Sequence, residues 1–381
     1  MKLYLNKYNF PIKQETLLRN LQQTQIISLD NCNNYSFCYP YLYYFFVAKY
    51  LAEHIDDNKE IIDSIINNLH KNENAYIAIF ISHYSKNNYI LDKLIKNASN
   101  LFKRYKPATL TNEELSFFDD RLGIAIKAVL PQTNATPEKE RTKRLGIQDK
   151  IEQIHNEEKK SSDADKEDDE LARELRRSIK MVEVMGRIIK NRAGSLEKTK
   201  LESVFEEAMK VHLKILTSFF ELIKDEKEQR GIVDFISNRL NKIIKDKVRK
   251  PSQEKLEKIS KTIFWNMNFF VVYGFISKII HSLGSDKLTE IIKRVCDNEN
   301  SPASFLVKHG ILMWYNKNLQ IDNIAKRIDE DGFSEIAKKI MKFSVINHCS
   351  MHSMGFKEKQ KIEHKLGIPS KKLLIKDFKK K

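Results

Sequence analysis

The chain has 381 residues, enough for two or three domains, and 41% of them are hydrophobic, which is enough to bury cores and excludes a disordered protein. Eleven Gly and eight Pro are too few for a β-sandwich or barrel built from many turns, whereas Lys, Glu, Ile and Leu dominate long stretches. The formal net charge of +16 raises the question of an anionic partner.

The first 55 residues are predicted to form a helix, a short β-hairpin and a second helix. A helix is expected from Thr16, and a polar turn then separates two β-like runs within residues 25–39. Pro40 opens a helix of aromatic and aliphatic residues that reaches about Ile55. Its rings could stack on single-stranded nucleic acid, but apolar residues cover nearly all of its sides, which favours a buried packing helix.

Beyond this helix, apolar residues recur at helical spacing and alternate with short polar links. The predicted fold is therefore all-α, with stacked antiparallel helices in two helical domains. Thr111 and Glu114 form a capping box, and Ser252 and Ser301 are predicted N-caps. Helices are expected near residues 61–69, 75–83, 90–105, 111–130, 170–192, 196–227, 231–248, 253–283, 286–296, 301–314 and 333–351.

A change of composition marks the boundary between the two helical domains. Residues 131–169 contain two prolines, a pair of serines and an acidic run, with few large apolar side chains, so we predict a charged flexible linker. This linker is compatible with a short charged helix near Arg144 to His155, whose side chains we expect to be only slightly buried. The predicted regions are 1–55, a helical hairpin region at 56–130, the linker at 131–169, a C-terminal helical domain at 170–370 and a tail at 371–381.

The excess of positive charge lies in the last third of the chain. Residues 251–381 carry a net charge of about +10, from 24 Lys and Arg against 14 Asp and Glu. A solvated tail is the simplest interpretation, but clustered cations also bind phosphate backbones without any motif, so nucleic acid is a candidate partner. The candidate polyanion-binding residues are Lys371, Lys372, Lys376, Lys379, Lys380 and Lys381.

One segment is long enough to cross a membrane. Residues 263–280 are largely apolar, but Asn266, Asn268 and Lys278 interrupt them, which favours a buried core helix over a membrane span. The first 20 residues lack the features of a secretory signal, and the four cysteines form no CxxC pair. We therefore expect a cytoplasmic protein with no membrane association.

The familiar catalytic motifs are missing from the sequence. There is no G-x-x-x-x-G-K-[ST], G-x-G-x-x-G, H-E-x-x-H or G-x-S-x-G, so we expect no enzyme activity and no cofactor. His348 and His352 are spaced i and i+4 beside Cys349, which is compatible with zinc. A closed zinc site needs four ligands and nothing nearby supplies the others, so the end of an amphipathic helix is the preferred interpretation.

The stretch from Tyr35 to Leu51 resembles the segment that closes the winged-helix part of prokaryotic NACHT-like STAND ATPases. In that family an aromatic strand leads into a helix rich in Phe, Tyr and Ala, and the spacing here agrees without gaps. The chain has Tyr39 where the family often has His. The matching positions are Tyr35, Phe37, Phe46, Ala48, Tyr50 and Leu51, and Tyr39 is the family-like position with a different residue.

The resemblance covers roughly residues 15–125 and implies a winged-helix-like remnant at 1–55 followed by the start of a helical sensor region. It implies a non-catalytic sensor or scaffold module that signals through protein contacts, commonly in antiphage defence. Because no P-loop is present, the resemblance implies a truncated or split protein whose partner is the missing ATPase module or a second copy of itself. The alternative is a free-standing basic helical protein that binds nucleic acid through its C-terminal half.

Overall fold

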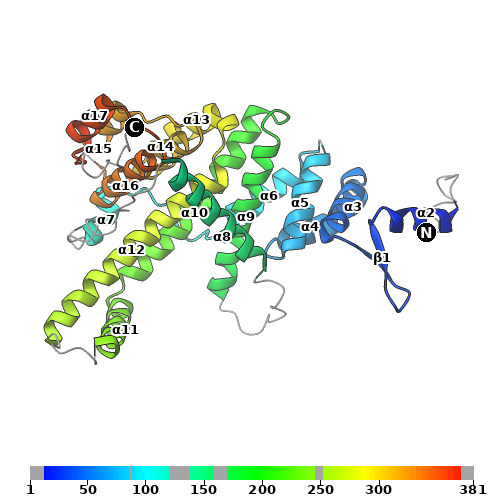
Figure 1. The fold of residues 1–381 in the computed structure, drawn as a ribbon, viewed down its shortest axis with the longest axis horizontal. Coiled ribbons are helices and arrows are strands. Elements are labelled where there is room, and N and C mark those ends of the chain that lie inside the picture. The colour runs from blue at the N-terminus through cyan, green and yellow to red at the C-terminus, as the bar shows by residue number, and fades with distance from the viewer. Residues whose placement is uncertain are drawn as a thin grey trace, which may run out of the picture. The chain divides into compact units, whose positions relative to one another are not determined.

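The computed structural model describes residues 13–85, 87–119, 137–157, 170–244, 252–330 and 332–369, with backbone alone for 148–157 and 244. These residues form α-helices and one two-stranded sheet (Figure 1), so the predicted all-α fold is confirmed. The chain divides into two compact units, Met1–Leu94 and Ile95–Lys381.

The first unit contains a β-hairpin and four helices before the division. The hairpin predicted within residues 25–39 is confirmed, because β1 and β2 pair antiparallel with Ile27 opposite Phe37. Its turn is closed by Asp30, whose Oδ1 accepts hydrogen bonds from the backbone N–H groups of Cys32 and Asn34, both at 2.8 Å. The elements are α2 (Gln14–Gln23), β1 (Ile27–Leu29), β2 (Tyr35–Phe37), α3 (Pro40–Glu53), α4 (Lys59–Asn67) and α5 (Asn72–Tyr84), and α6 (Tyr89–Asn100) crosses the division.

The second unit consists of helices of very different length. The short helices α15 and α17 were not predicted, and Pro137 begins a helix in the stretch predicted to be a linker. The elements are α7 (Asn112–Asp119), α8 (Pro137–Glu157), α9 (Glu170–Asn191), α10 (Lys198–Lys224), α11 (Glu226–Ile244), α12 (Gln253–Leu283), α13 (Thr289–Glu299), α14 (Pro302–Tyr315), α15 (Ile321–Ile328), α16 (Glu335–Met351) and α17 (Phe356–Leu366).

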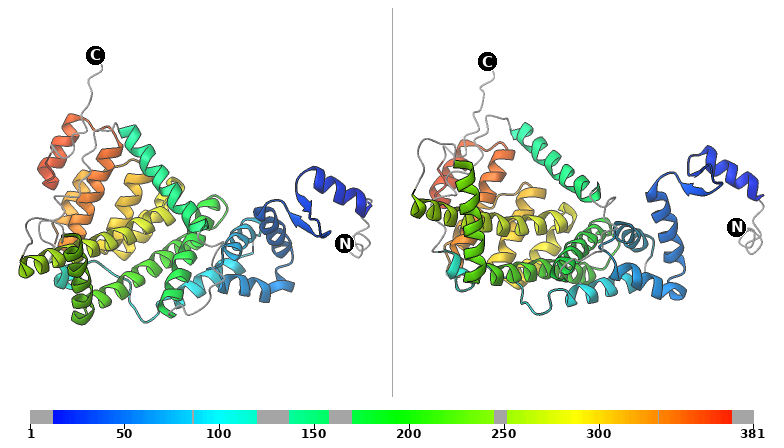
Figure 2. Two further views of the ribbon diagram at one scale, coloured as in Figure 1. Left: turned by 60° about the horizontal axis from the view of Figure 1, so that its bottom comes forward. Right: turned by 90° about the horizontal axis from the view of Figure 1, so that it is seen from below.

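The longest helix of the second unit, α12, has neighbours along its whole length, with α11 beside its N-terminal half (Figure 2). It packs against α9, α10, α11 and α14. In the part of the chain that the structure describes, it is the one helix long and apolar enough to cross a membrane, and 44% of its most apolar 18-residue window is buried. Core helices share this length and composition, and the buried face of α12 agrees with the core helix predicted for residues 263–280.

Several helix ends are fixed by the side chains that the sequence indicates. The hydroxyl of Ser252 accepts a hydrogen bond from the backbone N–H of Lys255, and Ser301 forms a capping box with Ser304, so both predicted N-caps are confirmed. Glu114 accepts hydrogen bonds from the backbone N–H groups of Thr109 and Leu110. The predicted extension of this helix toward residue 130 lies outside the described residues.

The helix in the predicted linker is longer and better packed than expected. It spans Pro137–Glu157, seven residues more at its N-terminal end than the predicted Arg144 to His155, and packs against α16. Glu140 is 5% exposed and accepts a hydrogen bond from Nε of Arg144 at 3.1 Å. The prediction that this helix is only slightly buried is therefore wrong at Glu140. Because Glu140 and Arg144 lie one turn apart, their ion pair compensates the buried carboxylate.

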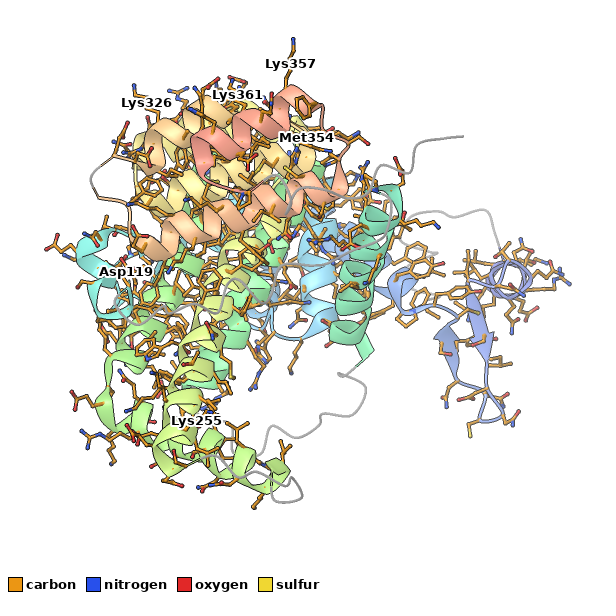
Figure 3. The ribbon with its side chains drawn as sticks, turned by 60° about the vertical axis from the view of Figure 1, so that its left-hand side comes forward. Asp119, Lys255, Lys326, Met354, Lys357 and Lys361 are labelled. Carbon is orange, nitrogen blue, oxygen red and sulfur yellow. The ribbon has the colours of Figure 1, made fainter. Side chains whose placement is uncertain are left out.

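The start of α16 is held by a side chain from a distant part of the sequence. The Asp119 carboxylate accepts hydrogen bonds from the backbone N–H groups of Glu335 at 2.9 Å and Ile336 at 3.0 Å. Figure 3 shows Asp119 at the end of α7. Because these N–H groups have no partner inside α16, the carboxylate satisfies them and complements the helix dipole.

Replacing this carboxylate should destabilise the second unit. Asp119→Ala is expected to lower the free energy of unfolding by about 1–2 kcal/mol, the usual cost of losing a capping side chain. Chemical denaturation followed by circular dichroism measures it. Glu113→Ala, an exposed carboxylate on the same helix, is the matched control, and equal effects of the two substitutions would refute the capping role.

Among the described residues of the second unit, His212, His309 and His348 are buried and His281 is partly buried. His212 and His309 are fully buried, and neither ring nitrogen of either residue has a hydrogen-bond partner among the described residues. Burial, with Lys278 adding to it at His212, lowers the pKa of both to about 3. Burial likewise lowers the pKa of His281 and His348 to about 4. All four are therefore neutral in the folded protein at pH 7.

These histidines predict an acid-labile second unit. Each takes up a proton on unfolding below about pH 6.5, so each lowers stability by about 1.4 kcal/mol per pH unit as the pH falls from there toward its folded pKa. Thermal unfolding between about pH 7.5 and pH 4.5 measures the slope. His212→Leu should reduce the slope without loss of stability at pH 7, because it removes a buried polar group that has no partner. A midpoint independent of pH would contradict this account.

Candidate functional site

Helix α3 carries two apolar faces on opposite sides. Ala48 and Leu51 are its buried residues and lie on the face toward α5. On the same side the Tyr44 ring stacks on Tyr76, with centroids 5.8 Å apart, and Phe45 meets Phe80 edge-on at 6.3 Å. These contacts form the core between α3 and α5.

The opposite face of α3 is aromatic and exposed. Tyr43, Phe46 and Tyr50 follow one another at helical spacings of three and four residues, so they lie along one stripe, and the exposed Tyr39 is the N-cap residue that precedes the helix. Their side chains are between 43% and 54% exposed. The prediction that this helix is buried in packing is therefore wrong for half of its circumference, because α5 covers one side and the stripe faces away from it.

The β-hairpin extends this stripe. Phe37 of β2 stacks on Phe46, with ring centroids 5.7 Å apart, and lies 6.1 Å from the Tyr43 ring. Tyr35 of the same strand is 49% exposed. We call the set Tyr35, Phe37, Tyr39, Tyr43, Phe46 and Tyr50 the aromatic surface.

The structure sorts the residues on which the family resemblance rests into two groups. Ala48 and Leu51 belong to the buried face, whereas Tyr35, Phe37, Tyr39, Phe46 and Tyr50 belong to the aromatic surface. Tyr43 also belongs to this surface but is not among the positions of the resemblance, although its place three residues before Phe46 on the helix is the signal that puts it there.

The aromatic surface has the chemistry of a protein interface. Exposed apolar patches of this kind mark interaction sites, and Tyr and Phe are enriched where proteins meet. Among the residues from Tyr35 to Tyr50 the single charged one is Lys49. A patch with so little charge resembles the centre of an interface rather than its rim.

The metal site considered for α16 has no further ligand within the described residues. The His348 and His352 rings lie 4.5 Å apart, but no group of three His, Cys, Asp or Glu side chains there could hold a metal ion. His348 Nδ1 lies 3.1 Å from the Met313 carbonyl oxygen. Burial raises the pKa of the Cys349 thiol to about 12, so it stays protonated. The three residues belong to a packed helix end.

The candidate polyanion-binding lysines, Lys371 to Lys381, lie outside the described residues. Two of the described helices in the last third of the chain, α15 and α17, also carry more basic than acidic residues. Lys326 of α15 and Lys357 and Lys361 of α17 lie on one outer face of the second unit (Figure 3). Lys361 and Lys365 form ion pairs with Asp322, which neutralises part of this charge.

Comparison with known proteins supports one part of the resemblance. Residues 1–47 match the model of the family described as Novel STAND NTPase 4. The chain is therefore related to STAND NTPases over α2, the hairpin and the first half of α3, the segment that carries most of the aromatic surface. No curated protein and no solved structure matches the chain.

Proposed function

We propose that this chain is a non-catalytic helical module of a STAND-type ATPase system, of the NACHT-like kind, that acts as a sensor or scaffold through protein contacts. The observation that carries the proposal is the aromatic surface, because it lies largely in the segment that is similar to STAND NTPases. Its partner is a STAND nucleotide-binding module that carries the P-loop which these 381 residues lack. The resemblance further suggests signalling in antiphage defence, and the scattered cysteines suggest the reducing cytoplasm.

The size of the aromatic surface supports a specific contact. A Tyr or Phe side chain buries about 150–250 Å² when fully covered. The six rings are partly covered already, so a partner would bury several hundred Å² more, a large share of the about 800 Å² per side of a specific interface. Large exposed rings of this kind are also the residues that contribute most to binding energy.

The described part of the chain also favours a role without catalysis. Its buried histidines are neutral and enclosed by packing, and its two buried cysteines, Cys296 and Cys349, have thiol pKa values raised to about 12 by burial. Such groups are poor nucleophiles and poor general bases at neutral pH. They serve the core of the second unit.

The test starts with the gene next to that of this chain. We expect an open reading frame there with G-x-x-x-x-G-K-[ST], whose product co-purifies with this chain when the two are co-expressed. The triple variant Tyr43→Ser, Phe46→Ser, Tyr50→Ser should weaken binding by at least about 100-fold, because interface rings cost about 1–4 kcal/mol each when removed. Affinity is measured by calorimetry on the purified pair.

The control for this test is Phe356→Ser, which removes a ring of the second unit that is 74% exposed. It should leave the affinity unchanged. Circular dichroism should show that the triple variant keeps its helices, since the three side chains lie on the exposed face of α3. Unchanged affinity of the triple variant, or the lack of any P-loop protein that binds, would overturn the proposal.

The alternative, nucleic-acid binding through the C-terminal half, is supported by the lysines of α15 and α17. If it holds, affinity for duplex DNA or RNA should fall steeply with salt, and Lys326→Glu with Lys357→Glu should weaken it about uniformly across sequences. Filter binding at several salt concentrations measures this. The matched control is Lys255→Glu on α12, since Lys255 is exposed but lies far along the chain from this cluster. Salt-independent binding, or equal effects of all three substitutions, would contradict the alternative.

A further inference from the structure

Helix α11 exposes apolar side chains along one side at the outer edge of the second unit (Figure 1). Its buried residues include Val233 and Ser237, and α10 and α12 pack against it. Ile232, Phe235 and Ile243, in contrast, are 39%, 61% and 70% exposed. The steps between them are close to one and two helical turns, so these three residues, which we call the α11 stripe, lie along one side of the helix. Large apolar side chains as exposed as these mark an interaction surface.

The charged residues of α11 are ordered along its length. All three acidic residues lie in its first half, whereas the charged residues after Phe235 are Arg239 and Lys242, both basic. Glu228 lies one turn before Ile232, at the start of the stripe, and Arg239 lies within the stripe. The helix as a whole carries four Lys and Arg against three Asp and Glu, so it is nearly neutral but has an acidic and a basic end.

A second copy of this helix, running in the opposite direction, would match the stripe in shape and in charge. If a twofold axis relates the two copies at the height of residues 237 and 238, Ile232 of each copy lies level with Ile243 of the other. Phe235 then lies beside Arg239 of the other copy. The Arg239 guanidinium carbon already lies 5.5 Å from the Phe235 ring centre within one chain, a contact that these residue types can also make across the axis.

We propose that α11 is a self-association surface, through which two copies of this chain pair with their α11 helices antiparallel. The acidic half of each helix faces the basic half of the other, so the charges are complementary when the two stripes are in contact. This charge order favours a second copy over an anionic membrane or a nucleic acid. Both of those partners select surfaces rich in Lys and Arg, whereas the charges of α11 almost cancel.

The size of α11 limits the strength of this contact. The helix has 19 residues and is about 28 Å long at about 1.5 Å per residue. A contact along one such helix in each copy falls below about 1,200 Å², which is the range of weak and transient complexes. We therefore expect a dissociation constant on the order of 10–100 µM. A contact of this strength forms mainly between chains that are already held close together.

Sedimentation velocity of the full chain from about 5 to 500 µM tests the proposal, and the wild-type chain should shift from monomer toward dimer over this range. Phe235→Glu should weaken the dimer by at least about tenfold, because it places a carboxylate between the apolar side chains of the two copies. Phe356→Glu, at a ring of α17 that is 74% exposed, is the matched control and should leave the dimer unchanged. A wild-type chain that stays monomeric to about 500 µM, or equal effects of the two substitutions, would overturn the proposal.

Exchanging charges tests the antiparallel arrangement. At low salt, Glu228→Lys and Lys242→Glu should each weaken the dimer by about threefold or more, because each places like charges at the facing ends of the two helices. The double variant Glu228→Lys, Lys242→Glu restores opposite charges across the axis and should regain the wild-type affinity. Single variants without effect, or a double variant weaker than both single variants, would contradict antiparallel pairing.

Two further measurements separate this contact from other uses of the chain. The triple variant of the aromatic surface should dimerise like the wild-type chain, so self-association through α11 can fail while the aromatic surface still binds its partner, and the reverse. Co-sedimentation with phosphatidylserine vesicles tests the membrane as the alternative occupant. If the wild-type chain stays monomeric and binds these vesicles, and Phe235→Glu does not bind them, the stripe belongs to a membrane contact and the proposal is overturned.

Discussion

A helix that is apolar on two opposite faces needs two partners, and this requirement on α3 governs the functional interpretation of the chain. Its face with Ala48 and Leu51 is satisfied by α5. Its face with Tyr39, Tyr43, Phe46 and Tyr50 remains in contact with solvent at roughly half of each ring. Hydrophobic burial is the dominant favourable term in folding and association, so the second face is a surface on which association gains free energy.

The hairpin holds part of the aromatic surface in a fixed position. Asp30 closes the turn by accepting hydrogen bonds from the backbone N–H groups of Cys32 and Asn34. The bond from Asn34 contributes most to lowering the pKa of the Asp30 carboxyl. The closed turn fixes the register of β1 and β2, which brings Phe37 onto Phe46. Two segments of the chain thus contribute rings to one continuous patch. This arrangement explains why strand and helix aromatics occur together in the segment similar to STAND NTPases.

Much of the fold could be predicted because its signals are local. The hairpin between residues 25 and 39, the caps at Ser252 and Ser301 and the long helices α10 and α12 follow from turn residues, capping side chains and apolar spacing. Helix α17 could not, because it is largely polar. Its stability comes from packing, which sequence periodicity does not report. Helix α15 was missed although Ile321, Ile324, Ala325 and Ile328 recur at the helical spacing i, i+3, i+4 and i+7.

The candidate functional residues could be predicted only in part, because sequence patterns do not report contacts between distant segments. The aromatic content of α3 shows that its faces favour burial, but not which face is already covered within the chain. The burial of Glu140 depends on α16, nearly two hundred residues away in sequence, so charged composition alone suggested a solvated linker.

Two carboxylates of the second unit that are partly or fully buried, Glu183 and Glu140, are compensated by cations of the same chain. Burial opposes ionisation of Glu183, but Lys278 at 2.7 Å and Lys180 at 3.2 Å outweigh it and lower its pKa to about 2. These lysines fully compensate the Glu183 carboxylate within the chain. Arg144 likewise compensates the buried carboxylate of Glu140, to which its Nε donates at 3.1 Å. The charge that remains for a polyanion therefore lies on exposed lysines such as Lys326 and Lys357, which offer charge without a shaped site.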